Sequence, residues 1–295
     1  MTADAPRDAP RRGIAFCLAS LVILAAQDTA TKILAQDYHV AQFVTVRYAV
    51  FALFALAYAW RRGRLAAALR PRRPWLQAAR SLLLVAEIGI FATAIRHLGL
   101  AEIHSILATF PLLATALAVP LLGEKVGARR WTGVGVGFLG TLVILRPGME
   151  GLFGPAALLA LLCALLYALY NLLTRLASRR DTFETAMVQM AVIGCAAVAP
   201  FGVAAWVPPA PADWALMGFI SVTGIAAHLL IIKSLECAPA SLLQPFNYTL
   251  LLWATLFGWL VFGALPDGWT VLGAVLVTGG GLYVIARERR RKGRA

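Results

Sequence analysis

Ionisable side chains lie inside long apolar stretches of this 295-residue chain, where each charge must find a partner or water. Asp28 and Lys32 are four residues apart on a predicted helix, and Arg47 lies at a similar depth in the next apolar run. In one interpretation Asp28 forms a structural ion pair with Arg47 or Lys32. In the other, Asp28 and Arg47 bind the α-amino and carboxylate groups of a small substrate. Lys32 can extend its ammonium to the polar surface and needs no function.

Glu87 differs from this group because no basic residue lies near its expected depth. Burial favours its neutral form, so Glu87 is the first candidate for proton coupling or for binding a substrate ammonium. A protonated, hydrogen-bonded structural role fits equally. His104 and His228 are weaker signals, since a histidine in an apolar segment is more often a packing residue than a proton relay.

Helical spacing gathers polar and small residues into two stripes. His104, Pro111 and Thr115 share one face of their predicted helix, and the segment from Gln244 to Thr255 repeats the spacing. Two such stripes suit a central pathway with two mouths, although hydrogen bonds between packed helices explain any single residue equally well. The candidate substrate-binding or pathway residues, including aromatic ones able to stack on a substrate ring, are Asp28, Arg47, Glu87, His104, Pro111, Thr115, Tyr167, Asn171, Gln189, His228, Gln244, Asn247, Tyr248 and Trp253.

Enzymatic chemistry has no visible machinery in this sequence. It holds no nucleophile–base pair, no metal-ligand cluster and no phosphate-binding loop for ATP. The four cysteines lie in or at the ends of separate apolar segments without C-x-x-C spacing, so neither disulfides nor metal binding is expected. We therefore expect a protein without metal or cofactor that is not an enzyme.

The elements that must position these residues are apolar segments. The chain is 60% apolar and 14% charged, whereas soluble domains are about 45–50% apolar and about 25% charged. About 20 residues cross a bilayer as a helix. The sequence therefore predicts an all-α integral membrane protein with ten transmembrane helices, near 13–34, 41–60, 75–97, 101–122, 130–146, 152–177, 183–205, 212–235, 240–262 and 267–286.

The net charge of +13 is explained by membrane orientation. With the N-terminus in the cytoplasm, most Lys and Arg fall in cytoplasmic loops and in the basic tails 1–12 and 287–295, as the positive-inside rule requires. No nucleic-acid partner is needed, and the C-terminal tail suits an anionic lipid surface. The first apolar run also has the length of a signal peptide, but its removal would leave two unequal halves, so we retain it as the first helix.

An internal duplication organises the chain. The stretch from Leu100 to Lys125 returns in diluted form 140 residues later, so that Thr109 and Ala114 match Thr249 and Ala254 without a gap. The predicted repeats are 13–146 and 152–286, with five spans each. Because five is odd, the second repeat enters the membrane from the opposite side, and inverted repeats of this kind usually build secondary transporters.

Small residues predict close helix contacts in the fifth and tenth spans. Gly133 and Gly137 form a G-x-x-x-G pattern, and a glycine triplet occupies 279–281. Such patterns bring helices together within one chain or between two. A homodimer through these two spans is allowed but not required.

The segments AIRHLGLAEIHSILATFPLLATALAVPLLGEK and APASLLQPFNYTLLLWATLFGWLVFGALPDGW, with the apolar runs after them, resemble the two EamA domains of the drug/metabolite transporter superfamily. The resemblance implies a ten-helix secondary transporter of the bacterial inner membrane with cytoplasmic termini. It also implies that the fifth and tenth helices stand outside a central cavity. Arg47 and Pro111 match family features, whereas Ala264 replaces the acidic residue that often follows glycine in the second repeat.

The function expected from this resemblance is alternating-access transport of a small amphipathic metabolite, most of all export of amino acids, including aromatic ones. One alternative is an importer of a nucleoside-like cofactor such as S-adenosylmethionine or riboflavin. Another is a non-transporting membrane scaffold or lipid-handling protein. The expected partners are the small-molecule substrate and the lipid bilayer.

Overall fold

The computed structural model describes residues 9–122, 127–145, 154–177, 180–238 and 240–292, and these residues are helical with short connections. The first half forms α1 (Ala9–Asp37), α2 (Val40–Arg61), the short α3 (Leu65–Ala68), α4 (Pro74–Ala94), α5 (Leu100–Leu107), α6 (Phe110–Leu122) and α7 (Ala128–Leu145). The second half forms α8 (Pro155–Ala177), α9 (Phe183–Ala204), α10 (Pro211–Cys237), α11 (Ala240–Leu243), the 3-10 helix η1 (Gln244–Tyr248), α12 (Thr249–Phe262) and α13 (Gly268–Lys292).

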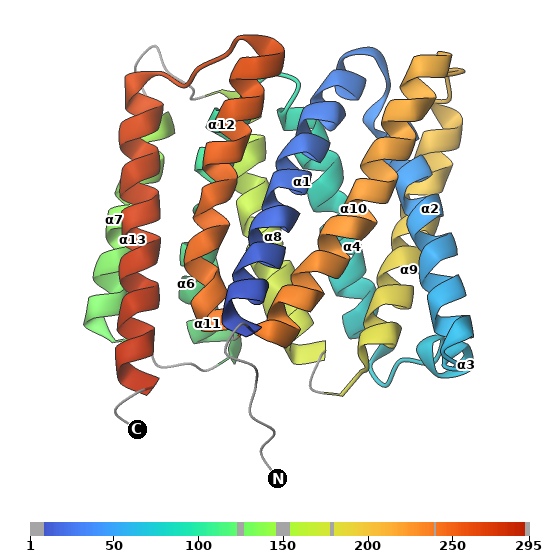
Figure 1. Ribbon diagram of the computed structural model, residues 1–295, viewed down its shortest axis with the longest axis horizontal. Coiled ribbons are helices and arrows are strands. Elements are labelled where there is room, and N and C mark those ends of the chain that lie inside the picture. The colour runs from blue at the N-terminus through green and yellow to red at the C-terminus, as the bar shows by residue number, and fades with distance from the viewer. Residues whose placement is uncertain (1–8, 123–126, 146–153, 178–179, 239, 293–295) are drawn as a thin grey trace.

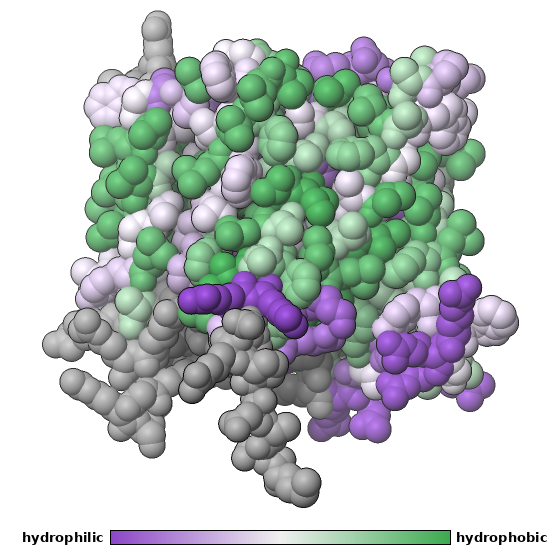
Figure 2. All heavy atoms as spheres, in the orientation of Figure 1, coloured by the Kyte–Doolittle hydropathy of each residue, from purple (hydrophilic) through white to green (hydrophobic). Residues whose placement is uncertain are grey.

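The predicted ten-span architecture is confirmed. Among the described residues, eight helical segments are long and apolar enough to cross a membrane, and two shorter apolar helices, Trp131–Leu145 and Gly268–Val284, complete the ten. The long helices lie side by side, and Ala9 and Lys292 are at the same end of the bundle (Figure 1). We call this the terminal end and the opposite one the far end. Apolar side chains cover the middle of the face in Figure 2, and hydrophilic ones gather mainly near the terminal end.

Each half of the chain packs mainly against the other half. The closest helix pairs are α1 with α10, α2 with α9, α4 with α8, and α7 with α13. If each span of the first half is exchanged with its equivalent in the second half, the α1–α10 pair becomes the α8–α4 pair. The α2–α9 and α7–α13 pairs each become themselves again. This is the pairing that a two-fold relation between inverted repeats produces.

The fourth and ninth spans differ from the expectation of continuous helices. Ala108 and Thr109 separate α5 from α6, and the ninth span consists of α11, η1 and α12. Pro111 has no N–H and therefore cannot donate a hydrogen bond to the carbonyl of Leu107. Just before it the turn is tighter than in an α-helix, because the N–H of Thr109 donates to the oxygen of Ile106 at 3.1 Å. Pro245 stands at the start of η1. The two equivalent spans are therefore broken helices.

Glycines bring α7 and α13 together within one chain. A Cβ on Gly140 would lie 2.7 Å from the backbone oxygen of Gly273, and one on Gly280 would lie 2.6 Å from that of Gly133. Side chains at these positions would push the helices apart. The close contacts predicted from the glycine patterns thus lie inside the protomer.

Candidate functional site

A cavity of about 500 Å³ lies between the two halves of the bundle. Its wall follows α1 from Cys17 to Thr31, a length of about 21 Å at 1.5 Å per residue. Residues of α2, α4, α5, α6, α8, α9, α10, α11, η1 and α12 complete the lining. Among the described residues α7 and α13 contribute none to this lining, as the resemblance implies for the fifth and tenth spans.

Most of the predicted site residues meet at this cavity. Its lining includes Asp28, Arg47, Glu87, His104, Pro111, Tyr167, Asn171, His228, Asn247 and Tyr248. His104 and Pro111 flank the break between α5 and α6, and Asn247 and Tyr248 belong to η1. The two broken helices therefore place their interruptions at the cavity, where irregular backbone is tolerated in a membrane protein.

The remaining predicted residues lie elsewhere. Gln189 donates from Nε2 to the backbone oxygen of Ala68 at 3.0 Å, which ties α9 to α3. Thr115 bonds to the oxygen of Pro111 within its own helix at 2.9 Å. Trp253 packs with the cluster around Cys17 and is not among the lining residues. Gln244 begins η1, and its side chain is outside the described part of the structure. These four positions are therefore not placed in the cavity wall.

Asp28 is paired with His104. Its Oδ2 lies 3.1 Å from Nε2 of His104, and both side chains are largely buried. The predicted partner Lys32 instead donates to the backbone oxygen of Leu98 at 2.6 Å and lies 5.1 Å from the centre of the Phe262 ring. Asp28 is thus held by a residue of the α5 segment and not by its helical neighbour.

Arg47 is half-buried in the cavity wall. Within the described part of the chain its guanidinium makes no hydrogen bond or ion pair. Gly224 of α10 gives it room, because a Cβ at that position would lie 3.4 Å from Nη2 of Arg47 and 3.0 Å from Oε1 of Gln27. A planar group with unused donors at a cavity wall can bind a carboxylate, a phosphate or ring carbonyls.

Glu87 is 7% exposed and lies on α4 at the cavity. Arg47 and Asp28 both interact with it electrostatically. The expectation that no basic residue lies near Glu87 was wrong, because Arg47 faces the same cavity. Asp28, Arg47 and Glu87 therefore form one group of opposite charges contributed by α1, α2 and α4.

Aromatic rings form another part of the wall. The ring centres of Phe110 and Tyr167 are 4.8 Å apart in an edge-to-face arrangement, and those of Tyr167 and Tyr170 are 5.9 Å apart and stacked. The hydroxyl of the buried Tyr48, also at the cavity, has no hydrogen-bond partner among the described residues. A planar heterocycle can stack on such rings while its polar atoms reach the charged group.

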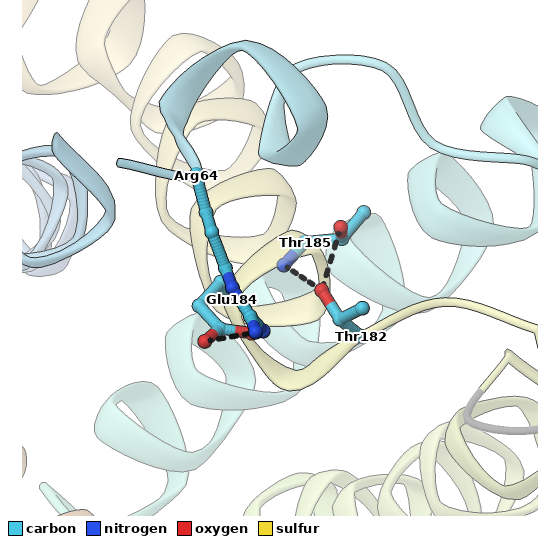
Figure 3. Close-up of polar contacts among 4 residues, drawn as sticks. All are labelled: Arg64, Thr182, Glu184 and Thr185. Carbon is cyan, nitrogen blue, oxygen red and sulfur yellow. Dashed lines mark hydrogen bonds and ion pairs between the residues drawn. The ribbon is translucent and has the colours of Figure 1, made fainter. Parts of the chain in front are cut away.

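Polar contacts hold the two halves together at both ends of the cavity. At the terminal end Nη1 of Arg64 lies 3.2 Å from Oε1 of Glu184, beside the N-cap Thr182 of α9 (Figure 3). At the far end the hydroxyl of Tyr38 donates to Oδ2 of Asp213 at 2.7 Å. Two further bonds join Gln42 to the backbone of residue 207.

Arg80 was missed as a candidate. It is 2% exposed on α4 and belongs to the same helical face as Leu84, Glu87 and Phe91, which line the cavity. The sequence places it beside the arginine-rich connection that precedes α4, so it was counted with the loop charges. Its spacing of seven residues from Glu87 was the signal that could have found it.

Comparisons with known proteins agree with this architecture. The family model described as "EamA-like transporter family" matches residues 11–146 and 154–286. A riboflavin transporter of Rhizobium johnstonii is 31% identical over 252 residues, covering 83% of this chain and 81% of the relative. An S-adenosylmethionine uptake transporter of Rickettsia prowazekii is 24% identical over 278 residues and covers 94% of each chain. A solved protein crystal structure at 20% identity shares the fold with a TM-score of 0.65, covering 96% of this chain and 99% of the other.

Proposed function

Because this chain belongs to the EamA-like transporter family, we propose that it is an uptake transporter for a nucleoside-like cofactor that works by alternating access. The observation that carries the proposal is one cavity that combines the aromatic wall of Phe110, Tyr167 and Tyr170 with the guanidinium of Arg47. This guanidinium has no hydrogen-bond or ion-pair partner among the described residues. Its volume of about 500 Å³ falls within the range of about 300–1,000 Å³ found for sites that enclose drug-sized ligands.

Riboflavin is the first candidate substrate. Its planar ring system can stack on the tyrosines, and its ring carbonyls can accept hydrogen bonds from Arg47. Its hydroxylated side chain suits Glu87 and Asn171, which line the same cavity. The relative named as a riboflavin transporter supports this candidate at 31% identity.

S-adenosylmethionine is the second candidate, and the charges of the cavity favour it. Its adenine can stack on the aromatic wall, and its carboxylate can pair with Arg47. Its ammonium and sulfonium groups suit Glu87 and Asp28. The relative named for uptake of this compound supports both the substrate and the direction of transport. Export of amino acids, the first expectation from the sequence, has no comparable support.

The mechanism that we propose is a rocking of helices from the two halves about the cavity. The breaks in the fourth and ninth spans supply places where the helices can bend. The Arg64–Glu184 pair and the Tyr38–Asp213 bond would alternately open and close the two ends. The arginines at 61–73 support, by the positive-inside rule, our proposal that the terminal end faces the cytoplasm.

Flux into proteoliposomes tests the proposal. Radiolabelled riboflavin, S-adenosylmethionine and a panel of amino acids are offered to purified protein in matched vesicles. Saturable flux of riboflavin or S-adenosylmethionine that exceeds flux in empty vesicles supports it. Flux of amino acids without flux of either cofactor would refute the proposal and support amino-acid transport instead. No flux at all in folded protein would favour a scaffold or lipid-handling role.

A further inference from the structure

Arg80 has more hydrogen-bond donors than partners. It is 2% exposed, and its Nη2 reaches the backbone oxygen of Ala186 at 3.2 Å and the sulfur of Met190 at 3.6 Å. Its guanidinium carbon lies 5.6 Å from the centre of the Tyr170 ring. The buried Nε and Nη1 atoms have no partner among the described residues. A buried charge with unfilled donors is costly and calls for an explanation.

No described carboxylate forms an ion pair with this guanidinium. Asp181 acts on Arg80 only at longer range, and its two oxygens accept hydrogen bonds from Nε2 of Gln77 at 2.7 Å and from the backbone N–H of Arg72 at 2.9 Å. Glu184, on the same helix as Met190, is paired with Arg64. The acidic groups near Arg80 in the described part of the chain are therefore occupied elsewhere, and its guanidinium has no carboxylate partner there.

The guanidinium lies directly behind the cavity wall. Its contacts Tyr170 and Met190 both line the cavity, and His228, another lining residue, interacts with it electrostatically. Along α4 it stands seven residues from Glu87, about 10 Å towards the terminal end. Tyr170 thus contacts both Arg80 and the cavity.

We propose that Arg80 forms a second substrate-binding site on the pathway, here called the anion station. It binds an oxyanion of the substrate, either a carboxylate or a phosphate, as the substrate moves between Arg47 and the terminal end. The inference rests on the proposed function for the pathway and deepens it, because an arginine with no carboxylate partner among the described residues favours the oxyanion-bearing members of the cofactor class, such as S-adenosylmethionine, over riboflavin. The planar fork of arginine can bind an oxyanion with two parallel hydrogen bonds through Nε and Nη1.

Binding of matched ligand pairs to purified protein tests the station. S-adenosylhomocysteine carries a carboxylate, together with an ammonium group, that methylthioadenosine lacks, and flavin mononucleotide carries a phosphate that riboflavin lacks. In each pair we call the member with the added oxyanion the anionic member and the other the neutral member. In wild type the anionic member of at least one pair should bind about 10-fold or more tightly than its neutral partner. Arg80→Gln should reduce this preference at least about threefold while the affinity for the neutral member is retained, and any remaining preference is due to Arg47. The exposed Arg70→Gln is the matched control for loss of charge at the same end and should keep the preference.

A merely structural role for Arg80 gives another result. Equal weakening of both members of a pair by Arg80→Gln, or an unchanged preference, would overturn the proposal. Arg80→Lys keeps the charge but not the planar fork, and it serves as the folded variant if the glutamine form is unstable. It should lose at least about threefold in affinity for the anionic member, and an unchanged affinity would also overturn the proposal.

Inorganic sulfate separates this inference from the proposed function. Millimolar sulfate, compared with chloride at equal ionic strength, should raise the Tm of wild type in a saturable manner, and Arg80→Gln should abolish the rise. If none of the four organic ligands binds but the sulfate result is as expected, the cofactor class is wrong and the anion station stands. A saturable sulfate effect that persists in Arg80→Gln, or no effect in wild type, refutes the station.

Discussion

Replacement of Arg47 by glutamine should separate substrate recognition from stability. The guanidinium has no hydrogen-bond or ion-pair partner among the described residues, so its removal leaves no described acceptor unsatisfied. The change in the free energy of unfolding should therefore stay below about 1 kcal/mol. In the loaded cavity the same substitution removes hydrogen bonds to a ligand acceptor, and a charge-assisted hydrogen bond is worth about 1.5–3 kcal/mol. At 1.4 kcal/mol per factor of ten, affinity should fall about 10- to 140-fold.

Two measurements on the same preparations check this expectation. Equilibrium binding of riboflavin and S-adenosylmethionine to detergent-purified protein gives the Kd, and thermal unfolding without ligand gives the Tm. Arg47→Lys is the matched control, because it keeps the charge but loses the planar fork. It should bind with intermediate affinity and retain the wild-type Tm.

Two results would refute the reasoning. An affinity for both ligands within twofold of wild type in Arg47→Gln would show that the guanidinium does not touch the substrate. A large fall in Tm together with the loss of binding would show that Arg47 supports the fold through partners that it lacks in this conformation.

Three further predictions follow from the packing and the charges. Asp28→Asn and His104→Gln should each lower the free energy of unfolding. If the two residues form a pair, the loss in the double variant should be smaller than the sum of the two single losses by about 0.5–3 kcal/mol. Additive losses in chemical unfolding would contradict the pair. Gly140→Ala places a Cβ 2.7 Å from a backbone oxygen of α13 and should lower the free energy of unfolding by about 1–3 kcal/mol. Gly135→Ala, whose Cβ would have no atom within 4 Å, should raise it by up to about 1 kcal/mol. Equal shifts in Tm would disprove the close contact. Glu87→Gln should abolish the part of substrate flux that a proton gradient drives, because the amide cannot take up or release the proton, and unchanged gradient dependence would exclude Glu87 from coupling.

The ten spans were predictable because hydrocarbon thickness fixes the length of an apolar helix and leaves a strong signal in the sequence. The breaks in the fourth and ninth spans were not predicted. Ala108 and Thr109 carry no helix-breaking signal of their own, and a proline such as Pro111 is often tolerated inside a membrane helix. Whether the helix continues there depends on its neighbours, which a sequence pattern does not contain.

Most of the residues predicted from depth and helical spacing lie at the cavity, but the pairing of charges was not predicted. Asp28 and Arg47 were predicted at a similar depth, and both line the cavity. The pairing of Asp28 with His104 depends on which helices are neighbours and how each is rotated. Arg80 was missed for a related reason, since its place near the end of α4 suggested a solvated charge and only the packing of α8 and α9 buries it.

Transport itself is the most direct test of the central claim. Proteoliposomes containing wild type, Arg47→Gln or no protein are supplied with radiolabelled riboflavin or S-adenosylmethionine, and initial rates are measured over a range of concentrations. The account predicts saturable uptake of at least one of the two by wild type, with a KM raised at least about 10-fold in Arg47→Gln. Folded wild-type protein that moves neither compound above the rate in empty vesicles would contradict it.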